Sequence, residues 1–209
     1  MPIWHLKERL AFKVSPTRVY GAEGVSDPGP KTALGSSPDR AWRVCFGRIA
    51  VMGHNITIRK AVPEDADKIS RVVHDSFLAD VAPENSKEGV DFFLRVQSAA
   101  YFRKKMPEFI SAYVAEKSGE IIGVIALGKK LSTFFILPEH QRSGVGKRLL
   151  SIAVTDWSAK TSETILSVNS SPNAVEAYVK MGFVPAGKED LANNIRFVPM
   201  QADVKKLVP

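Results

Sequence analysis

Apolar positions recur along the chain with two different periods, and these periods predict an α/β domain from about residue 56 onward. Short runs that alternate between apolar and polar residues, or that are continuously apolar, are typical of strands. Helices instead place apolar residues three and four positions apart. On these grounds strands are expected at residues 56–60, 110–115, 121–127, 131–137, 165–168, 183–185 and 195–200.

Helices are expected in the intervals between these strands. The first begins at Pro63 with acidic residues in its first turn, and the second carries apolar side chains over residues 92–101. The third covers residues 145–153. The fourth extends over 171–182, from a Ser-Pro start to a glycine stop. The order is strand, helix, helix, three strands, helix, strand, helix, two strands, which predicts an α/β sheet flanked by helices.

Residues 1–51 lack a lasting periodicity and are rich in Pro, Gly and Ser. Such a segment cannot bury enough apolar surface to offset its loss of conformational entropy, so we expect it to be disordered. We hypothesise that Met52 is the native start and that residues 1–51 are an untranslated upstream extension. A disordered tail that belongs to the native protein is the alternative. In both interpretations residues 52–209 form one domain.

Composition narrows the class of protein. The chain has 209 residues, of which 44% are hydrophobic and 24% charged, and it contains no apolar run long enough to span a membrane. The net charge of +7 is not gathered into the dense basic stripe of a nucleic-acid-binding protein. The lone Cys45 excludes disulfides within the chain, and the four histidines lack metal-ligand spacing. We therefore expect a cytoplasmic protein without a metal, a nucleic-acid partner or a membrane partner.

The turn Gln141-Arg142-Ser143-Gly144-Val145-Gly146 lies between an expected strand and an expected helix. A glycine-containing turn at a helix start leaves backbone N–H groups free beside the positive end of the helix dipole, which favours a phosphate or pyrophosphate. The spacing does not fit a P-loop, because Arg148 follows Gly146-Lys147. It does not fit a dinucleotide fingerprint either, because Leu149 stands at the third glycine position.

A second motif follows at residues 164–183, where a short β-rich run leads through Ser171-Pro172 into a helix. This helix carries Tyr178 and ends at Gly182-Phe183. Together, the Gln-x-x-Gly-x-Gly turn and the Ala-x-x-x-Tyr-x-Lys-x-Gly-Phe pattern resemble the two signatures of the GNAT superfamily of acyl-CoA-dependent N-acetyltransferases. The resemblance covers about residues 55–203.

The resemblance implies a mixed, mostly antiparallel sheet flanked by helices, with splayed central strands and acetyl-CoA as cosubstrate in the gap between them. The strand of residues 131–137 and the next parallel strand would border this gap. The CoA pyrophosphate would lie on the turn. The residues that the resemblance assigns to cofactor binding are Phe135, Ile136, Leu137, Gln141, Arg142, Ser143, Gly144, Val145, Gly146, Lys147 and Asn169.

Acetyl transfer to an amine needs donors for the carbonyl oxygen and a proton for the leaving thiolate. The resemblance makes Tyr178 the candidate general acid, because a phenol stays protonated at neutral pH. From its spacing alone, Tyr178 would instead be a core residue of an amphipathic helix, and only the resemblance favours the catalytic role. Backbone N–H groups near residues 135–137 would serve as oxyanion donors. Asn169 would contact the pantetheine arm or the acceptor, or else cap its loop.

No general base stands out. Many relatives carry a glutamate on the strand that corresponds to residues 131–137, and this strand has no carboxylate. Glu116 is expected at a hairpin end in solvent, Glu139 and His140 in the phosphate loop, and His74 in a structural role on the first helix. We therefore expect a water-mediated base, or an acceptor that arrives already neutral.

The acceptor groove is expected between the segment of residues 80–88 and the segment of residues 187–194. Both carry acidic side chains that would suit a cationic amine, namely Asp80, Glu84, Glu88, Glu189 and Asp190. The sequence thus predicts an enzyme that transfers acetyl from acetyl-CoA to a primary amine, with a small-molecule acceptor favoured over a protein. A homodimer is compatible with this prediction. The alternative is a catalytically silent acyl-CoA-binding or sensing module.

Overall fold

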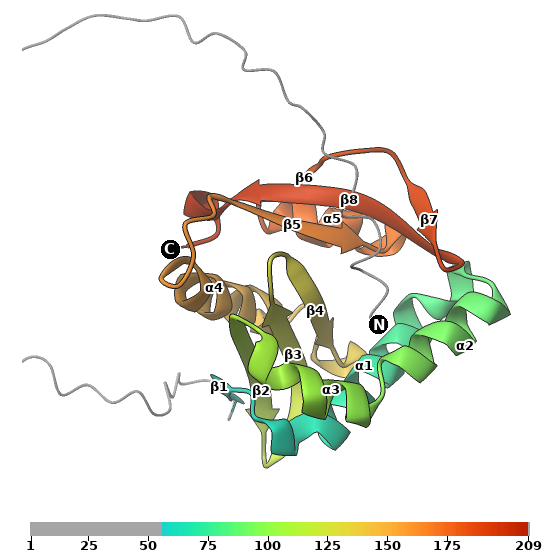
Figure 1. Cartoon of the computed structure of the whole chain (residues 1–209), viewed down its shortest axis with the longest axis horizontal. Coiled ribbons are helices and arrows are strands. Elements are labelled where there is room, and N and C mark those ends of the chain that lie inside the picture. The colour runs from blue at the N-terminus through green and yellow to red at the C-terminus, as the bar shows by residue number, and fades with distance from the viewer. Residues whose placement is uncertain (1–55, 209) are drawn as a thin grey trace, which may run out of the picture. The chain divides into compact units, whose positions relative to one another are not determined.

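The computed structural model describes residues 56–208, and the expected extension at residues 1–51 lies outside that range. Figure 1 shows a mixed sheet flanked by helices. The strand order is β1-β2-β3-β4-β5-β8-β6, and β7 pairs with β8. Neighbouring strands are antiparallel except for β4 and β5, which are parallel. The strands are β1 (Ile56–Lys60), β2 (Ser111–Lys117), β3 (Glu120–Leu127), β4 (Leu131–Ile136), β5 (Ile165–Ser170), β6 (Val184–Pro185), β7 (Asp190–Ala192) and β8 (Ile195–Asp203). The predicted fold class is confirmed, and β7 is an additional strand.

The α-helices are α1 (Ala66–Asp80), α2 (Lys87–Val96), α3 (Ala99–Lys105), α4 (Val145–Ser158) and α5 (Val175–Lys180). The single second helix predicted from the sequence is wrong, because the chain breaks it into α2 and α3. Gln97 leaves helical geometry, and the hydroxyl of Ser98 accepts a hydrogen bond from Tyr101 N and so caps α3. No helix within residues 56–208 combines the length and apolarity needed to cross a bilayer.

The start of the last helix also differs from the prediction. Ser171 is the cap residue, but its hydroxyl donates to Asn173 Oδ1 at 2.6 Å instead of capping a backbone N–H. The chain first makes a 3-10 turn over Pro172–Ala174 and only then enters α5. Gly182 ends the helix as predicted, with φ of 103°, a backbone conformation that favours glycine.

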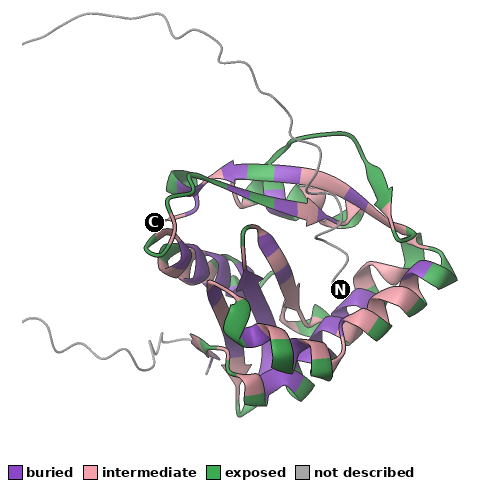
Figure 2. Cartoon of the chain, in the orientation of Figure 1, coloured by how far each residue is buried: buried purple, intermediate pink, exposed green. Residues whose placement is uncertain are grey.

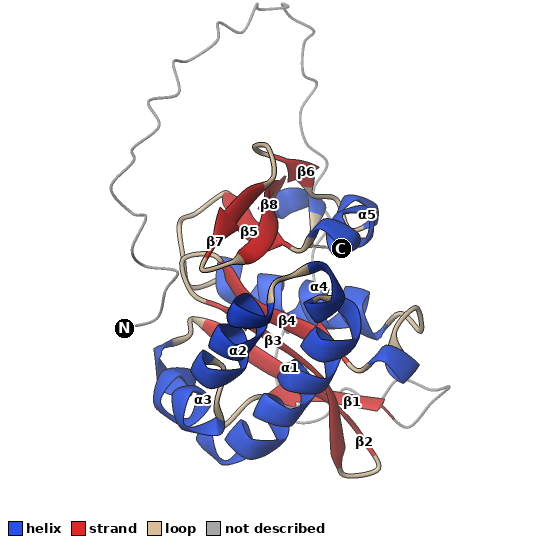
Figure 3. Cartoon of the chain, turned by 90° about the vertical axis from the view of Figure 1, so that its right-hand side faces the viewer, coloured by secondary structure: helices blue, strands red, loops and turns tan. Residues whose placement is uncertain are grey.

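Helices cover the sheet on both faces, as Figure 3 shows. One face packs α4 and α5 against the central strands around Leu149, Trp157 and Leu166. The other face packs α1 and α3 around Ile69, Val73, Phe102 and Val124. Figure 2 shows buried residues concentrated on the central strands and on the inner sides of α1 and α4. Burial of these two apolar layers is the main stabilising contribution to the domain.

A β-bulge at Ser132 changes the course of β4. Leu127 pairs with Leu131, whereas Ala126 pairs with Thr133, so Ser132 is an extra residue in the ladder. A bulge bends its strand and increases the local twist. At this same point β4 and β5 share their one register pair, Leu131 with Val168. Beyond that pair the two strands separate, and Figure 1 shows β4 and β5 apart.

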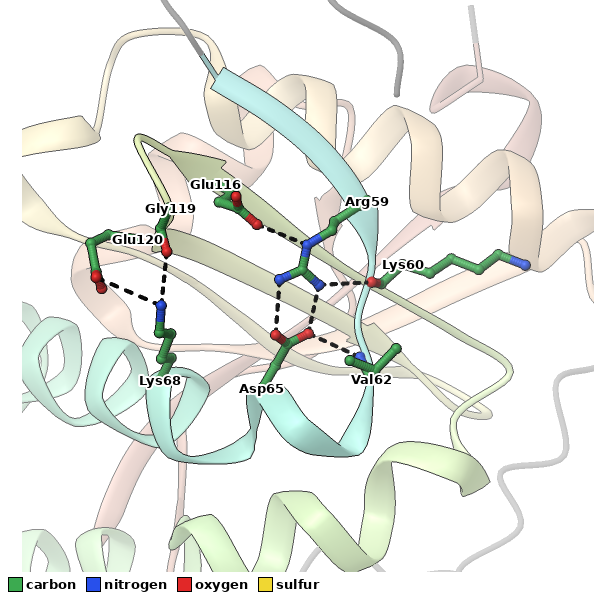
Figure 4. Close-up of polar contacts among 8 residues, drawn as sticks. All are labelled: Arg59, Lys60, Val62, Asp65, Lys68, Glu116, Gly119 and Glu120. Atoms are coloured by element: carbon green, nitrogen blue, oxygen red, sulfur yellow. Dashed lines mark hydrogen bonds and ion pairs between the residues drawn. The ribbon is translucent and has the colours of Figure 1, made fainter. Parts of the chain in front are cut away.

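An ion-pair network fixes β1 to the start of α1 and to the β2–β3 hairpin, as Figure 4 shows. Arg59 donates to both Asp65 oxygens, at 2.7 and 2.9 Å, and to Glu116 Oε2 at 2.8 Å. The predicted Ser118-Gly119 turn is confirmed, with positive φ at both residues. The expectation of a solvated Glu116 is wrong, because its carboxylate is a half-buried partner of Arg59.

Candidate active site

In the described part of the chain, the loop after β4 leaves backbone N–H groups unpaired at the start of a helix. Arg142 and Gly144 both adopt the left-handed conformation, with φ of 54° and 84°. Gly144 is the cap residue of α4 and makes no side-chain cap bond. Within residues 56–208, the backbone N–H groups of residues 142–147 donate no hydrogen bond. These free donors lie at the positive end of a 14-residue helix.

Gln141 holds this loop in place through its side chain. Its Nε2 donates to Asp80 Oδ2 at 2.6 Å and to Ile136 O at 3.1 Å. The backbone carbonyl of Asp80 also accepts a hydrogen bond from Asn173 Nδ2. Asp80 therefore joins the end of α1 to the phosphate loop and to the turn before α5. Gln141 was predicted to bind the cofactor, and the structure gives its amide an anchoring role.

The two glycines of the turn have different reasons to be glycine. A Cβ on Gly144 would meet nothing within 4 Å, so its positive φ is what favours glycine there. A Cβ on Gly146 would lie 2.9 Å from Ile136 Cδ1, with Met181 and Phe134 also close. Gly146 was expected to let the backbone approach a ligand. Its missing side chain allows α4 to pack closely against β4, and its role in ligand approach stays a prediction.

Three cations surround the free amides. Arg142 and Lys147 are exposed and Arg148 is half-buried. None of the three forms an ion pair with another residue in the range 56–208. The Ser143 hydroxyl donates to His140 O at 2.6 Å and helps to shape the turn. A phosphate-bearing ligand would thus meet both backbone donors and positive charge.

The separation of β4 from β5 exposes a backbone edge of β4. The N–H of Leu137 donates to Ile122 O at 2.9 Å, on the β3 side. Leu137 is therefore not the oxyanion donor that was expected. Because successive N–H groups in a strand point to opposite edges, the Ile136 N–H points away from β3. Asn169, half-buried on β5, lies across from Pro199 of β8, and its role in cofactor binding stays a prediction.

Tyr178 lies on the α4–α5 side of β4. Its side chain is buried, and its ring makes edge contacts with Phe134 at 6.2 Å and with Phe183 at 5.3 Å between centroids. Burial raises the pKa of the Tyr178 hydroxyl well above its ordinary value. No residue within 56–208 makes a hydrogen bond to this hydroxyl. The phenol therefore stays protonated and keeps its proton available for a ligand.

The opposite face of β4 carries an aromatic stack that the sequence motifs do not reveal. Phe93 of α2 stacks on Phe77 of α1, with ring centroids 3.7 Å apart and planes at 8°. Phe93 also makes an edge contact with Phe135 of β4 at 6.1 Å. The adjacent residues Phe134 and Phe135 thus point to opposite faces of β4. The only signal in the sequence was the placement of Phe77 and Phe93 on the apolar faces of their helices.

The predicted walls of the acceptor groove do meet. The Asn85 side-chain oxygen accepts a hydrogen bond from Arg196 N at 2.8 Å, and a Cβ on Gly89 would lie 2.2 Å from Asn194 O. An open polar depression lies between α2 and the β7–β8 turn, lined by Glu88, Asp91, Phe92, Arg95, Asn193 and Asn194. The segments at 80–88 and 187–194 are therefore neighbours, as the sequence predicted.

The acidic side chains of these walls are already engaged. Arg196 pairs with Glu189 at 2.6 Å and with Glu84 at 3.9 Å, and the hydrogen bond from Arg196 lowers the pKa of Glu189. Asp80 is bound by Gln141. Bonds from its own backbone N–H and from Ser86 lower the pKa of the exposed Glu88. Arg196 therefore offsets the negative charge of Glu84 and Glu189, whereas the hydrogen bonds to Glu88 leave its charge in place.

No base candidate gains support from the structure. His74 Nε2 lies 3.0 Å from Gln97 O, a contact that joins α1 to the end of α2. Glu116 belongs to the Arg59 network, and β4 carries no carboxylate. Within residues 56–208, no group of three or more His, Cys, Asp or Glu side chains is placed to hold a metal ion.

Residues 81–204 match the family model described as the acetyltransferase (GNAT) domain. The chain belongs to the GNAT acetyltransferase family. The match includes the turn at residues 141–146, the separated strands β4 and β5, and Tyr178. No curated protein matches the sequence of this GNAT domain.

Solved structures of GNAT proteins share the fold. A GCN5-related N-acetyltransferase from Rhodopseudomonas palustris has a TM-score of 0.63 at 22% identity, covering 74% of this chain and 98% of its own. The PaiA N-acetyltransferase from Thermoplasma acidophilum, in complex with coenzyme A, has a TM-score of 0.61 at 22% identity over 71% and 98% of the two chains. YncA from Salmonella typhimurium, with its cofactor acetyl-CoA, has a TM-score of 0.52 at 19% identity over 72% and 95%.

Proposed function

We propose that this protein transfers the acetyl group of acetyl-CoA to the primary amine of a small acceptor molecule, by direct attack within a ternary complex. The observation that carries the proposal is the set of free backbone N–H groups at residues 142–147, placed where β4 separates from β5. The family supports an acyltransferase. The CoA complex of PaiA and the acetyl-CoA complex of YncA support the choice of cosubstrate.

The residues present fit acetyl-CoA. The amides of the turn, together with Arg142, Lys147 and Arg148, would hold its phosphates. The edge of β4 beyond Leu131 would receive its pantetheine arm in place of β5. When bound, acetyl-CoA supplies an activated acyl group and a sulfur that leaves as a thiolate.

The chain itself supplies two catalytic groups. The Ile136 N–H, directed away from β3, would donate to the acyl oxygen as negative charge develops on it. Tyr178 holds a proton whose pKa burial has raised, and it would donate this proton to the leaving sulfur. Since β4 has no carboxylate, the acceptor would lose its proton to water or arrive neutral.

The missing carboxylate also favours a second candidate, an acyl-CoA-binding or sensing module without turnover. Such a module would keep the phosphate loop and the gap between the strands. It would not need a protonated phenol beside the sulfur. Catalytic turnover separates the two functions.

The test measures amine-dependent release of CoA from acetyl-CoA by the full-length protein, with CoA separated by chromatography so that Cys45 does not interfere. The amine panel spans aromatic amines, polyamines, amino acids, aminoglycosides and short peptides. Turnover with at least one class, slowed by Tyr178→Phe, supports the proposal. Silence across the panel, together with an acetyl-CoA-dependent rise in melting temperature, supports the binding module.

A further inference from the structure

The two faces of β4 differ in what they leave free for the second substrate. On the α4–α5 side, the half-buried Phe134 contacts the buried ring of Tyr178, which in turn contacts the buried ring of Phe183. On the other side, both Phe135 and Phe93 are half-buried. If Tyr178 protonates the leaving sulfur from the first face, the acceptor amine must approach from the second.

An amine approaching from that side meets aromatic rings. Phe93 lies between Phe77 and Phe135, with one ring stacked at 3.7 Å and the other at its edge at 6.1 Å. The neighbouring positions on the inner face of α1, Val72 and Val73, are buried and apolar. The wall is therefore flat and uncharged, and it suits a ring more than a chain of charged groups.

The charged groups of the neighbourhood lie elsewhere. Lys87 and Asp91 pair with each other on the exposed side of α2. Arg95 lies over the ring of Phe92, 5.4 Å from its centroid, in the polar depression. A polyamine or an aminoglycoside needs several free carboxylates, and Glu84 and Glu189 are bound by Arg196.

From these contacts we propose that the acceptor is a primary amine carried by an aromatic ring or by a short aryl-alkyl chain, with no second charge. This inference rests on the proposed acetyl transfer and specifies its substrate class. The ring of the acceptor packs against Phe93 and Phe135, and its amine points toward the end of β4.

The aromatic wall also accounts for the missing base. Moving an ammonium group out of water into an apolar site lowers its pKa, because desolvation disfavours the charged form. The amine then loses its proton to water without a dedicated carboxylate. Its neutral nitrogen attacks the acyl carbon, a C–N bond forms and the C–S bond breaks, and the sulfur receives a proton from Tyr178. The nitrogen releases its second proton to water to give the neutral amide, and the tyrosinate regains a proton from solvent.

The experiment compares 2-phenylethylamine with 1,4-diaminobutane as acceptors for the full-length protein. We expect kcat/KM to be at least about tenfold higher for 2-phenylethylamine, since a buried ring contributes much more apolar area than a short alkyl chain. Phe93→Ala should lower kcat/KM for 2-phenylethylamine by about tenfold or more and leave the KM for acetyl-CoA unchanged. Phe93→Leu keeps apolar volume and should give an intermediate value. Leu78→Ala, at an exposed apolar position of α1 next to Phe77, is the matched control and should change neither value.

Calorimetry measures the binding of 2-phenylethylamine to the protein–CoA complex. Together with the turnover data, it tests the substrate class separately from acetyl transfer. Two outcomes would overturn the substrate class and leave acetyl transfer intact. One is a preference for diaminobutane over 2-phenylethylamine. The other is turnover of 2-phenylethylamine that neither Phe93 variant affects. Binding that Phe93→Ala abolishes, without turnover of any amine, overturns acetyl transfer and supports the aromatic site. Absence of both binding and turnover overturns both.

Discussion

Gln141 and Asp80 lie 61 positions apart in the sequence and are joined by a hydrogen bond of 2.6 Å between Nε2 and Oδ2. Through it, the end of α1 fixes the loop whose backbone N–H groups are free. The bond is partly buried and its acceptor is charged, so it belongs to the stronger class of hydrogen bonds. The geometry of the anion site therefore depends on a residue outside the motif.

Gln141→Ala should weaken CoA binding without unfolding the protein. Loss of a hydrogen bond to a charged group costs about 1.5–3 kcal/mol, and about 1.4 kcal/mol corresponds to a tenfold change in Kd. We expect the Kd for CoA, measured by calorimetry, to rise by about tenfold. Asp80→Asn keeps an acceptor oxygen and should have a smaller effect. Ser143→Ala, which removes an exposed bond to His140, is the control. An unchanged Kd in Gln141→Ala would show that the loop needs no anchor.

Gly146→Ala should destabilise the fold through contact with Ile136. The new methyl group would lie 2.9 Å from Ile136 Cδ1, and overpacking of this kind typically costs about 1–3 kcal/mol. Ile136→Val removes that carbon and should partly rescue the variant, which a double-mutant cycle of unfolding free energies would detect.

Gly144→Ala is the contrasting substitution at the same turn. Its methyl group would meet no atom within 4 Å, so only the backbone strain at φ of 84° should contribute, about 1–2 kcal/mol. No rescue by Ile136→Val is expected for it. Equal rescue of both glycine variants would refute the contact at Gly146.

Tyr178→Phe should lower kcat by about 10²–10⁴-fold and leave the KM for acetyl-CoA nearly unchanged, because it removes a proton donor and keeps the ring. The contacts with Phe134 and Phe183 involve the ring alone and should survive. An unaltered kcat would assign Tyr178 to the core.

Burial of Tyr178 has a second consequence, for stability at alkaline pH. A tyrosine in the unfolded chain ionises near pH 10, and its folded pKa is higher. The stabilising contribution is therefore fully present below about pH 10 and is lost as the pH rises above it, since the unfolded state then releases a proton that the folded state keeps. Denaturant unfolding from about pH 8 to 11 should show a steeper loss in the wild type than in Tyr178→Phe.

Asp65→Asn should lower the unfolding free energy at neutral pH by about 1–3 kcal/mol, because it removes charged hydrogen bonds from Arg59. Burial by itself raises the pKa of Asp65, but the bonds from Arg59 and from Val62 N outweigh burial, and the net pKa lies below its usual value. This stability is present above about pH 4 and is lost as the pH falls further toward the folded pKa.

The difference between wild type and Asp65→Asn should therefore shrink in acid. Asp91→Asn removes the carboxylate of an exposed pair with Lys87 and is the matched control, with little or no expected effect on stability. A difference that stays constant down to pH 2 would mean that ionisation of Asp65 does not stabilise the fold.

The sequence predicts the elements that local chemistry determines. Ser118-Gly119, Gly182 and the Gly144 turn each need a special backbone conformation, and the structure has a positive φ at all four of these residues. Apolar periodicity likewise located the central strands and α4. The break between α2 and α3 was missed, because its cap at Ser98 lies inside a run of helix-compatible residues.

Relationships between distant segments could not be predicted. Nothing local marks Asp80 as the partner of Gln141, or Glu116 as the partner of Arg59. The position of Phe93 between Phe77 and Phe135 requires α1, α2 and β4 to be placed together. The direction of the Leu137 N–H depends on how β4 pairs with β3, which appears only in the register of the strands.

Ser132 determines which side of the sheet each later residue of β4 faces. Leu131 and Phe134 share the α4–α5 side although three positions separate them, an odd spacing that a regular strand does not allow. Deletion of Ser132 would leave these faces unchanged, because Leu131 and Phe134 would then be two positions apart in a regular strand. If Ser132 were instead a regular member of the ladder, the Phe134 ring would turn toward α2 and the Phe135 ring toward the phenol of α5. The bulge thus determines which aromatic ring would meet the leaving group and which the incoming amine.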